Sequence, residues 1–126
     1  PHKESWKDAA VWRTVAEHRL PLIGYPLEAS GGSLPAERSF LKIEGMELGL
    51  SCFKIGSSDQ EVVIRLYEMA GEEGRATLEF PFRVSRVSLL DLRENVIGDL
   101  PTSDSTVTFP VDSHSIITLK VTKASA

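Results

Sequence analysis

The sequence predicts an all-β protein: an antiparallel β-sandwich with an N-terminal entry segment that is irregular or forms a short helix. From Arg38 onward, apolar and polar residues alternate in short runs, the period of strands with one buried face. Polar turns separate these runs and no helix-length pattern intervenes, which is typical of a sandwich. The 126 residues suit one domain with a single core. We expect residues 1–37 to form the entry segment and loop, and residues 38–126 the sandwich. Together they read as one domain, a fragment of a larger chain.

Composition argues against several classes of partner. The net charge is −4 and the basic residues are scattered, so we expect no binding to nucleic acid or to a membrane surface. No apolar run reaches the roughly 20 residues that span a bilayer. The single cysteine, Cys52, has no partner for an internal disulfide, which favours a reducing compartment and a cytoplasmic location.

The entry segment permits two conformations. Helix formers lie around Asp8–His18, and Asp8 is suited to a helix N-terminus. The same stretch contains the β-formers Val-Trp-Arg-Thr-Val. These β-formers make an extended conformation the slightly stronger prediction. Pro21 ends any helix. Leu20–Leu27 is predicted to be extended and irregular, burying its Leu and Ile side chains across a surface. Glu28–Pro35, rich in glycine and serine, is a predicted loop.

The predicted strands follow from the alternation. In Glu61–Met69 both faces are partly apolar, which suits a central strand. Ala70–Gly74 is predicted as a hairpin connection and Arg93–Asp104 as a polar loop. Cys52 alternates with Leu48 and Leu50 and is predicted to be a small buried side chain. The other strands are Ser39–Ile43, Met46–Ile55, Arg75–Phe82 (Ala76, Leu78, Phe80 and Phe82 inward), Val84–Leu92, Ser105–Val111 and His114–Thr122 (Ile117, Leu119 and Val121 on one face).

We assign no catalytic, cofactor-binding or metal-binding residue to this chain. Asp112 and His114 have a spacing that puts two ligand types on one side of a strand, but a zinc site needs three or four ligands. Asp91 is expected to cap a loop by accepting backbone N–H groups. No nucleophile elbow, catalytic triad order or phosphate-binding glycine loop is present in the sequence. Glu72 and Glu73 are interpreted as residues of a solvated turn, and Glu94 flanks a strand end together with Asp91; Asp99 and Asp104 are the other carboxylates noted.

Aromatic residues give little sign of a sugar-binding platform. Trp6 and Trp12 lie in the entry segment, and Tyr25 and Tyr67 are isolated in the sequence. Arg65 and Tyr67 can share a surface, although such neighbours are usually cross-strand partners.

A series of short landmarks runs in order from Leu20 to Val121, about four-fifths of the chain. They are Leu20-Pro21-Leu22, Gly32-Ser33-Leu34-Pro35, Ser39-Phe40-Leu41, Leu48-Gly49-Leu50-Ser51 with Lys54, Val62-Val63-Ile64-Arg65-Leu66-Tyr67-Glu68, Gly71, Ala76-Thr77-Leu78, Asp91-Leu92 with Glu94, and Ile116-Ile117-Thr118-Leu119-Lys120-Val121. In this order and spacing they resemble the C-terminal β domain of family 38 glycoside hydrolases, the α-mannosidases. One departure is Asp112-Ser113-His114-Ser115, where that family usually has an arginine–proline–phenylalanine–glutamate-like entry to the last strand.

The resemblance implies a non-catalytic domain that buttresses a catalytic domain and helps to shape its cleft. In that family the nucleophilic aspartate and the zinc or other divalent metal belong to an N-terminal catalytic domain, so no site residue carries over to this chain. The implied partners are the parent enzyme's catalytic and middle domains and, through the parent, a mannose-containing glycan. The fragment itself is then not an enzyme, whereas the parent is a glycoside hydrolase.

Two alternatives stay open. One is an independent carbohydrate- or protein-binding sandwich, and the other is a small stand-alone enzyme that uses Asp112 and His114. If the entry segment normally lies against a missing partner domain, the chain should expose apolar side chains near Trp6, Trp12 or Leu20–Leu27.

Overall fold

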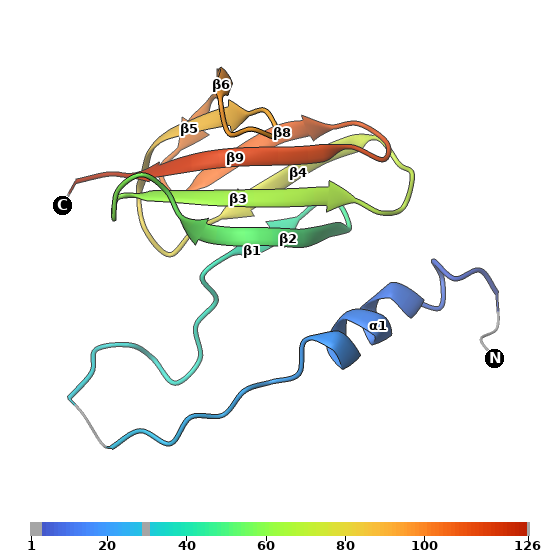
Figure 1. Ribbon diagram of the computed structural model, residues 1–126, viewed down its shortest axis with the longest axis horizontal. Helices are drawn as coiled ribbons and strands as arrows, with labels where there is room; N and C mark the ends of the chain where they lie inside the picture. The colour runs from blue at the N-terminus through green and yellow to red at the C-terminus, as the bar shows by residue number, and fades with distance from the viewer. Residues whose placement is uncertain (1–3, 29–30, 126) are drawn as a thin grey trace. The chain divides into compact units, whose positions relative to one another are not determined.

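The computed structural model describes residues 4–28 and 31–125 (Figure 1). The chain divides into two compact units, with the boundary between Glu37 and Arg38. Among the described residues, the first unit holds one helix and the second holds the strands.

Helix α1, Val11–Arg19, is the regular element of the first unit. The extended conformation favoured for this stretch is therefore wrong, and the short helix is present. Asp8 does not cap it: the N-cap is Ala10, in the left-handed region at φ 46° with no side-chain cap, and Asp8 is bonded to Ser5 instead. Local helix formers outweigh the β-formers because the described residues of this unit include no strand that could pair with them. The helix ends just before Pro21, as expected.

The apolar segment after α1 is exposed rather than buried. Leu20, Leu22, Ile23 and Leu27 have exposed fractions of 77%, 104%, 73% and 89%. The prediction that Leu20–Leu27 buries its side chains is wrong for this chain. The exposure agrees with the expectation for an entry segment without its partner domain.

The second unit is a β-sandwich of two antiparallel sheets, which confirms the predicted fold class (Figure 1). One sheet has the order β1-β4-β8-β7, with strands Lys42–Glu44, Gly74–Glu79, Thr106–Val111 and Thr102–Ser103. The other has the order β2-β3-β9-β5-β6, with strands Leu48–Ile55, Glu61–Glu68, Ile116–Lys123, Val84–Leu90 and Val96–Leu100.

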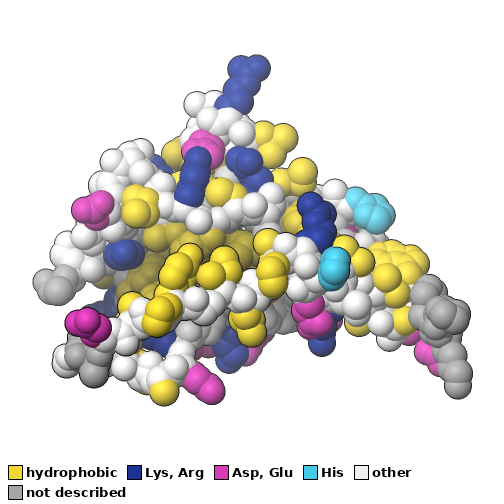
Figure 2. Space-filling model, turned by 60° about the horizontal axis from the view of Figure 1, so that its bottom comes forward, with side chains coloured by type: hydrophobic (Ala, Val, Ile, Leu, Met, Phe, Trp, Pro, Cys, Tyr) yellow, Lys and Arg dark blue, Asp and Glu magenta, His cyan; other side chains and the backbone are white. Residues whose placement is uncertain are grey.

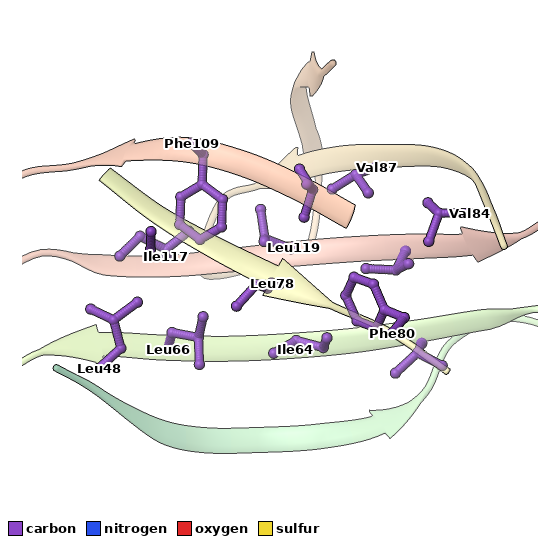
Figure 3. Packing of buried hydrophobic residues seen from close by; sticks show 14 of the residues in the cluster. Leu48, Ile64, Leu66, Leu78, Phe80, Val84, Val87, Phe109, Ile117 and Leu119 are labelled. Atoms are coloured by element: carbon purple, nitrogen blue, oxygen red, sulfur yellow. The ribbon is translucent and has the colours of Figure 1, made fainter. Parts of the chain in front are cut away.

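The core lies between the two sheets (Figure 3). Leu66 and Leu119 from one sheet and Leu78 from the other are fully buried, and Phe109 is 2% exposed. The side chains predicted to point inward on Arg75–Phe82 and on the last strand are buried, except for Phe82, which is only partly buried. Burying a side chain of this size contributes about 1.5–3 kcal/mol, so this alternation supplies most of what holds the sheets together.

Strand β3 is central, as its sequence predicts. It pairs with β2 on one side and β9 on the other. Val62, Ile64 and Leu66 are buried toward the core, and Val63 on the opposite face is only 4% exposed.

The predicted hairpin at Ala70–Gly74 is wrong. Strands β3 and β4 belong to different sheets, so the connection crosses from one layer to the other. Both edges of β3 are already occupied by β2 and β9, which leaves no edge for the following strand. Gly71 adopts φ +73° in this crossover.

The predicted polar loop Arg93–Asp104 contains two strands, β6 and β7. Each lies at the edge of its sheet, β6 beside β5 and β7 beside β8. Edge strands tolerate the polar, glycine and proline residues that make this stretch look like a loop.

A bulge in β2 overturns the prediction for Cys52. The register shifts between Leu50, which is opposite Leu66, and Cys52, which is opposite Arg65. The extra residue turns Cys52 to the outer face of the sheet, where it is partly exposed, and Leu50 is 48% exposed.

Gly45 makes the turn that follows β1. Its φ is +89°, and a Cβ added there would lie 2.5 Å from the carbonyl oxygen of Arg75. Both the conformation and the close approach of backbone require glycine at this position.

Candidate functional site

Glu68, at the end of β3, is the one charged residue that is buried among the residues the structure describes. Its Oε1 accepts the backbone N–H of Ala70 at 2.6 Å. Its Oε2 accepts the N–H groups of Gly71 and His114 at 2.8 and 2.9 Å. One carboxylate thus joins the β3–β4 crossover to the turn that precedes β9.

The electrostatics of Glu68 fit an anchor rather than a proton acceptor. Burial raises its pKa, but the backbone N–H groups of His114, Gly71, Ala70 and Glu72 together outweigh burial and hold the pKa below its ordinary value. A carboxylate that stays ionised with its oxygens already bonded is a weak general base at neutral pH.

The turn that Glu68 holds contains Asp112 and His114. They lie in the turn before β9, where the Asp112 carbonyl accepts both the N–H and the hydroxyl of Ser115. The His114 side chain is 76% exposed, with Nδ1 4.0 Å from Glu68 Oε2. Within residues 4–28 and 31–125, no group of three or more His, Cys, Asp or Glu side chains is arranged to hold a metal ion.

Asp91 caps the loop after β5, as its sequence position predicts. Its Oδ1 accepts the backbone N–H groups of Arg93 and Asn95 at 2.8 and 2.9 Å, and its Oδ2 accepts the Asn95 side-chain amide at 2.9 Å. The Asn95 side chain and then these backbone groups lower the pKa of Asp91.

The other carboxylates singled out in the sequence lie at the surface or make contacts with neighbouring side chains. Glu72 and Glu73 are exposed in the β3–β4 crossover. Asp99 accepts a bidentate contact from Arg86 at 3.0 and 2.8 Å and a bond from Ser88 at 2.8 Å. Arg86 and then Ser88 lower the pKa of Asp99. Asp104 pairs with Arg83 at 2.9 Å. These are exposed or edge contacts that orient side chains on the sheet surface.

The outer face of the five-stranded sheet carries a second polar cluster around Arg65. Its Nε donates to Thr118 Oγ1 at 3.0 Å and its Nη2 to the Leu92 carbonyl at 3.4 Å. Glu94 Oε1 lies 3.7 Å from Arg65 Nη2 and 2.7 Å from Lys54 Nζ. The cluster ties β2, β3, β9 and the Asp91 loop together.

Tyr67 lies on the same outer face and covers Gly49 of β2. A Cβ added to Gly49 would lie 2.2 Å from Tyr67 Cζ, so the aromatic side chain occupies the space that glycine leaves open. Tyr67 nevertheless stays 40% exposed. The glycine therefore sets the position of an exposed aromatic side chain.

Sequence reasoning missed both Glu68 and the Gly49–Tyr67 contact. A signal for Glu68 was available, because the alternation of Val62, Ile64 and Leu66 places residue 68 on the buried face. The Gly49–Tyr67 contact had no sequence signal, because it depends on the register between β2 and β3.

The face drawn in Figure 2 carries charged side chains of both signs. In the view of Figure 2, basic and acidic side chains are interspersed rather than gathered by sign. Among the residues that the structure describes, no helix has the length and apolarity needed to cross a membrane.

Comparison with known families identifies the sandwich. Residues 47–119, more than half of the chain, match the model described as the Glycosyl hydrolases family 38 C-terminal beta sandwich domain. The matched range begins just before β2 and ends within β9. No curated protein matches the chain significantly. The chain belongs to the family of C-terminal β-sandwich domains of family 38 glycosyl hydrolases.

Proposed function

We propose that this chain is the non-catalytic C-terminal β-sandwich of an α-mannosidase, and that the parent enzyme hydrolyses α-mannosidic bonds. The family match over residues 47–119 is the observation that carries the proposal. A domain of this family is one part of a larger glycosidase, so its substrate belongs to the parent and not to the sandwich alone. Mannose specificity comes from the family resemblance quoted above.

The proposed role is to buttress the parent's catalytic and middle domains and to shape one wall of the substrate cleft. The exposed Leu20–Leu27 segment supports this role, because side chains as exposed as Leu22 and Leu27 are normally covered by a partner. The polar groups of the sandwich support it as well, since Glu68 and Asp91 hold backbone rather than a reacting group.

Two further features belong to the same proposal. The zinc or other divalent metal is held by the parent's catalytic domain, and the sandwich supplies none of its ligands. The parent resides in a reducing, cytoplasmic compartment, which the unpaired Cys52 supports.

The test is an assay of two proteins on an aryl α-mannoside with added zinc or cobalt. The full-length parent is expected to hydrolyse it and the 126-residue chain is not. Hydrolysis by the isolated chain would contradict a non-catalytic role. An inactive parent would contradict the assignment to an α-mannosidase.

A further inference from the structure

The core side of strand β2 is only partly covered. The pairing with β3 shows which way its side chains point, because directly opposite residues of an antiparallel pair project to the same face. Leu50 lies opposite Leu66, and Phe53 lies opposite Ile64. Leu66 and Ile64 are fully buried in the core, whereas Leu50 and Phe53 are 48% and 43% exposed. The cover over the core therefore stops between β3 and β2.

The length of β1 explains why the cover stops there. Residues 45–47 join β1 to β2, and at about 3.3 Å per residue the three residues of β1 span about 10 Å against about 26 Å for the eight of β2. The opposite layer therefore faces only the first part of β2. Accordingly, Leu48 at the start of β2 is buried, while Ile55 at its end, opposite the buried Val62, is 68% exposed.

Strand β1 is also an open edge. It is the terminal strand of its sheet, and among the described residues only β4 pairs with it. The two sheets run in the same direction, because β7 at the other end of the four-stranded sheet contacts β5. A strand added to the free edge of β1 would therefore continue that layer over the uncovered part of β2. The unpaired edge and the uncovered core side lie at the same margin of the sandwich (Figure 1).

We propose that this margin, formed by the free edge of β1 and by Leu50, Phe53 and Ile55 of β2, is a strand-addition site for an extended segment of a preceding domain of the parent enzyme. The segment pairs with β1 through main-chain hydrogen bonds and directs every second side chain, which is apolar, onto β2. The main-chain bonds supply affinity, and the fit of the alternate side chains selects the segment. The inference deepens the proposed function and rests on it for the existence of the preceding domain.

The course of the chain favours a segment of the parent over a second copy of this chain. Residues 38–41 lead directly into β1, so the polypeptide enters the sandwich at this margin (Figure 1). In a C-terminal domain the rest of the parent precedes the sandwich in sequence, and its neighbouring domain is thus tethered here. Tethering through a short linker gives an effective concentration on the order of millimolar.

An untethered partner would find too little to hold. A second copy pairing at β1 would use a strand of three residues and three partly exposed apolar side chains. A stable interface between separate molecules buries roughly 800 Å² on each partner, which this margin does not offer. Short edge strands of this kind resist pairing between molecules, whereas a tethered segment needs less contact area.

The first experiment compares amide hydrogen exchange, read by mass spectrometry, in the 126-residue chain and in the full-length parent. We expect the amides of β1 to exchange at least about tenfold more slowly in the parent, because an added strand protects them. Peptides from β6, the edge strand at the other end of the five-stranded sheet, should exchange equally in both proteins. Equal exchange of β1 in the two proteins would overturn the proposal.

Ile55→Asp tests the apolar half of the site. In the 126-residue chain the side chain is 68% exposed, so the urea midpoint should stay within about 0.3 M of the unaltered chain. In the parent the charge would be buried without a partner, and the exchange of β1 should return to the rate of the isolated chain. The milder Ile55→Ser should change exchange in the same direction. Exchange of β1 in the parent that ignores both substitutions would overturn the proposal.

Ile97→Asp is the matched control. Ile97 lies on the edge strand β6 and is 62% exposed, which is close to the value for Ile55. This substitution should leave the exchange of β1 unchanged in both proteins. An equal effect of Ile97→Asp and Ile55→Asp on β1 in the parent would show a general response to surface charge and would overturn the assignment to the margin.

Photo-cross-linking identifies the occupant. Benzoylphenylalanine introduced at position 55 of the parent should cross-link within one molecule, to a single stretch that precedes the sandwich. A cross-linked dimer would show that a second copy occupies the margin. A cross-link to residues 4–28 would show that the entry segment occupies it. Either result would overturn the proposal.

The two proposals fail separately. A parent that does not hydrolyse the aryl α-mannoside refutes the proposed function, while exchange and cross-linking still decide whether a strand adds to β1. An active parent whose β1 exchanges as fast as in the isolated chain refutes the strand-addition site alone.

Discussion

Replacing Glu68 by glutamine tests the idea that one carboxylate joins two loops of the sandwich. Glutamine keeps the shape of the side chain but offers one acceptor oxygen. If that oxygen takes the Oε2 position, it retains the bonds from Gly71 and His114, and the amide N–H₂ then faces the N–H of Ala70. One donor is left unsatisfied, and the two remaining bonds lose their assistance by charge.

The magnitude follows from these three bonds. A buried unsatisfied donor costs about 1–3 kcal/mol, and a bond to a charged acceptor contributes roughly 1 kcal/mol more than a neutral one. We therefore expect Glu68→Gln to lower the free energy of unfolding by about 3 kcal/mol at pH 7. Urea unfolding followed by far-UV circular dichroism measures this change. The matched control is Glu73→Gln, an exposed carboxylate of the adjacent connection, which should change it by less than about 0.5 kcal/mol.

The pH dependence of the free energy of unfolding is a second test of the same hydrogen bonds. Because folding lowers the pKa of Glu68 below its ordinary value of 4.5, its ionised form stabilises the fold above that pH. This contribution is lost as the pH falls through the folded-state pKa. Asp91 and Asp99 are present in both proteins, so the difference between wild type and Glu68→Gln isolates Glu68. The difference in the free energy of unfolding between wild type and Glu68→Gln should be largest at neutral pH and should become smaller below about pH 4.5. Equal free energies of unfolding for the two proteins at pH 7, or a difference that does not change with pH, would refute the reasoning.

Three other changes test the core, the turns and the capped loop. Leu78→Ala should cost about 2–5 kcal/mol in urea unfolding, whereas Leu22→Ala, fully exposed, should be within about 0.5 kcal/mol of wild type; equal losses would contradict the assigned core. Gly45→Ala should destabilise more than Gly71→Ala in the same assay, because fixed backbone blocks the first Cβ and an exposed imidazole the second, and the reverse order would contradict it. Asp91→Ala should speed amide hydrogen exchange in its loop by at least about tenfold, and unchanged exchange would show that the cap is dispensable.

The fold class followed from the sequence because alternation alone decides which side chains enter the core. The inward sets on β4 and β9 needed no knowledge of how the strands pair. The pairing itself did not follow. A short glycine-containing connection after β3 looks like a hairpin, and only the occupied edges of β3 exclude it. The prediction that Cys52 is buried was wrong for a similar reason, because a bulge moves every residue beyond it to the opposite face of the strand.

The candidate site was less predictable than the fold. Asp91 was found because a capping aspartate acts within a few residues of itself. Tyr67 was judged isolated because its partner Gly49 lies on another strand, and glycine carries no side chain to signal a contact. The contacts that define the outer face join residues that are distant in sequence, and only the strand register brings them together.

The position of β9 has a consequence for how the domain reaches its folded state. The last strand in sequence lies in the middle of the five-stranded sheet, between β3 and β5. Until β9 is in place, β3 and β5 each expose an unpaired edge, and the buried Leu119 and Val121 are missing from the core. We therefore expect the sandwich to fold cooperatively and only after residues 116–123 are available to pair. The expected time scale is milliseconds to seconds, as in sandwiches whose paired strands are far apart in sequence. A ribosome-bound chain that lacks these residues should be a substrate for chaperones rather than a partly native domain.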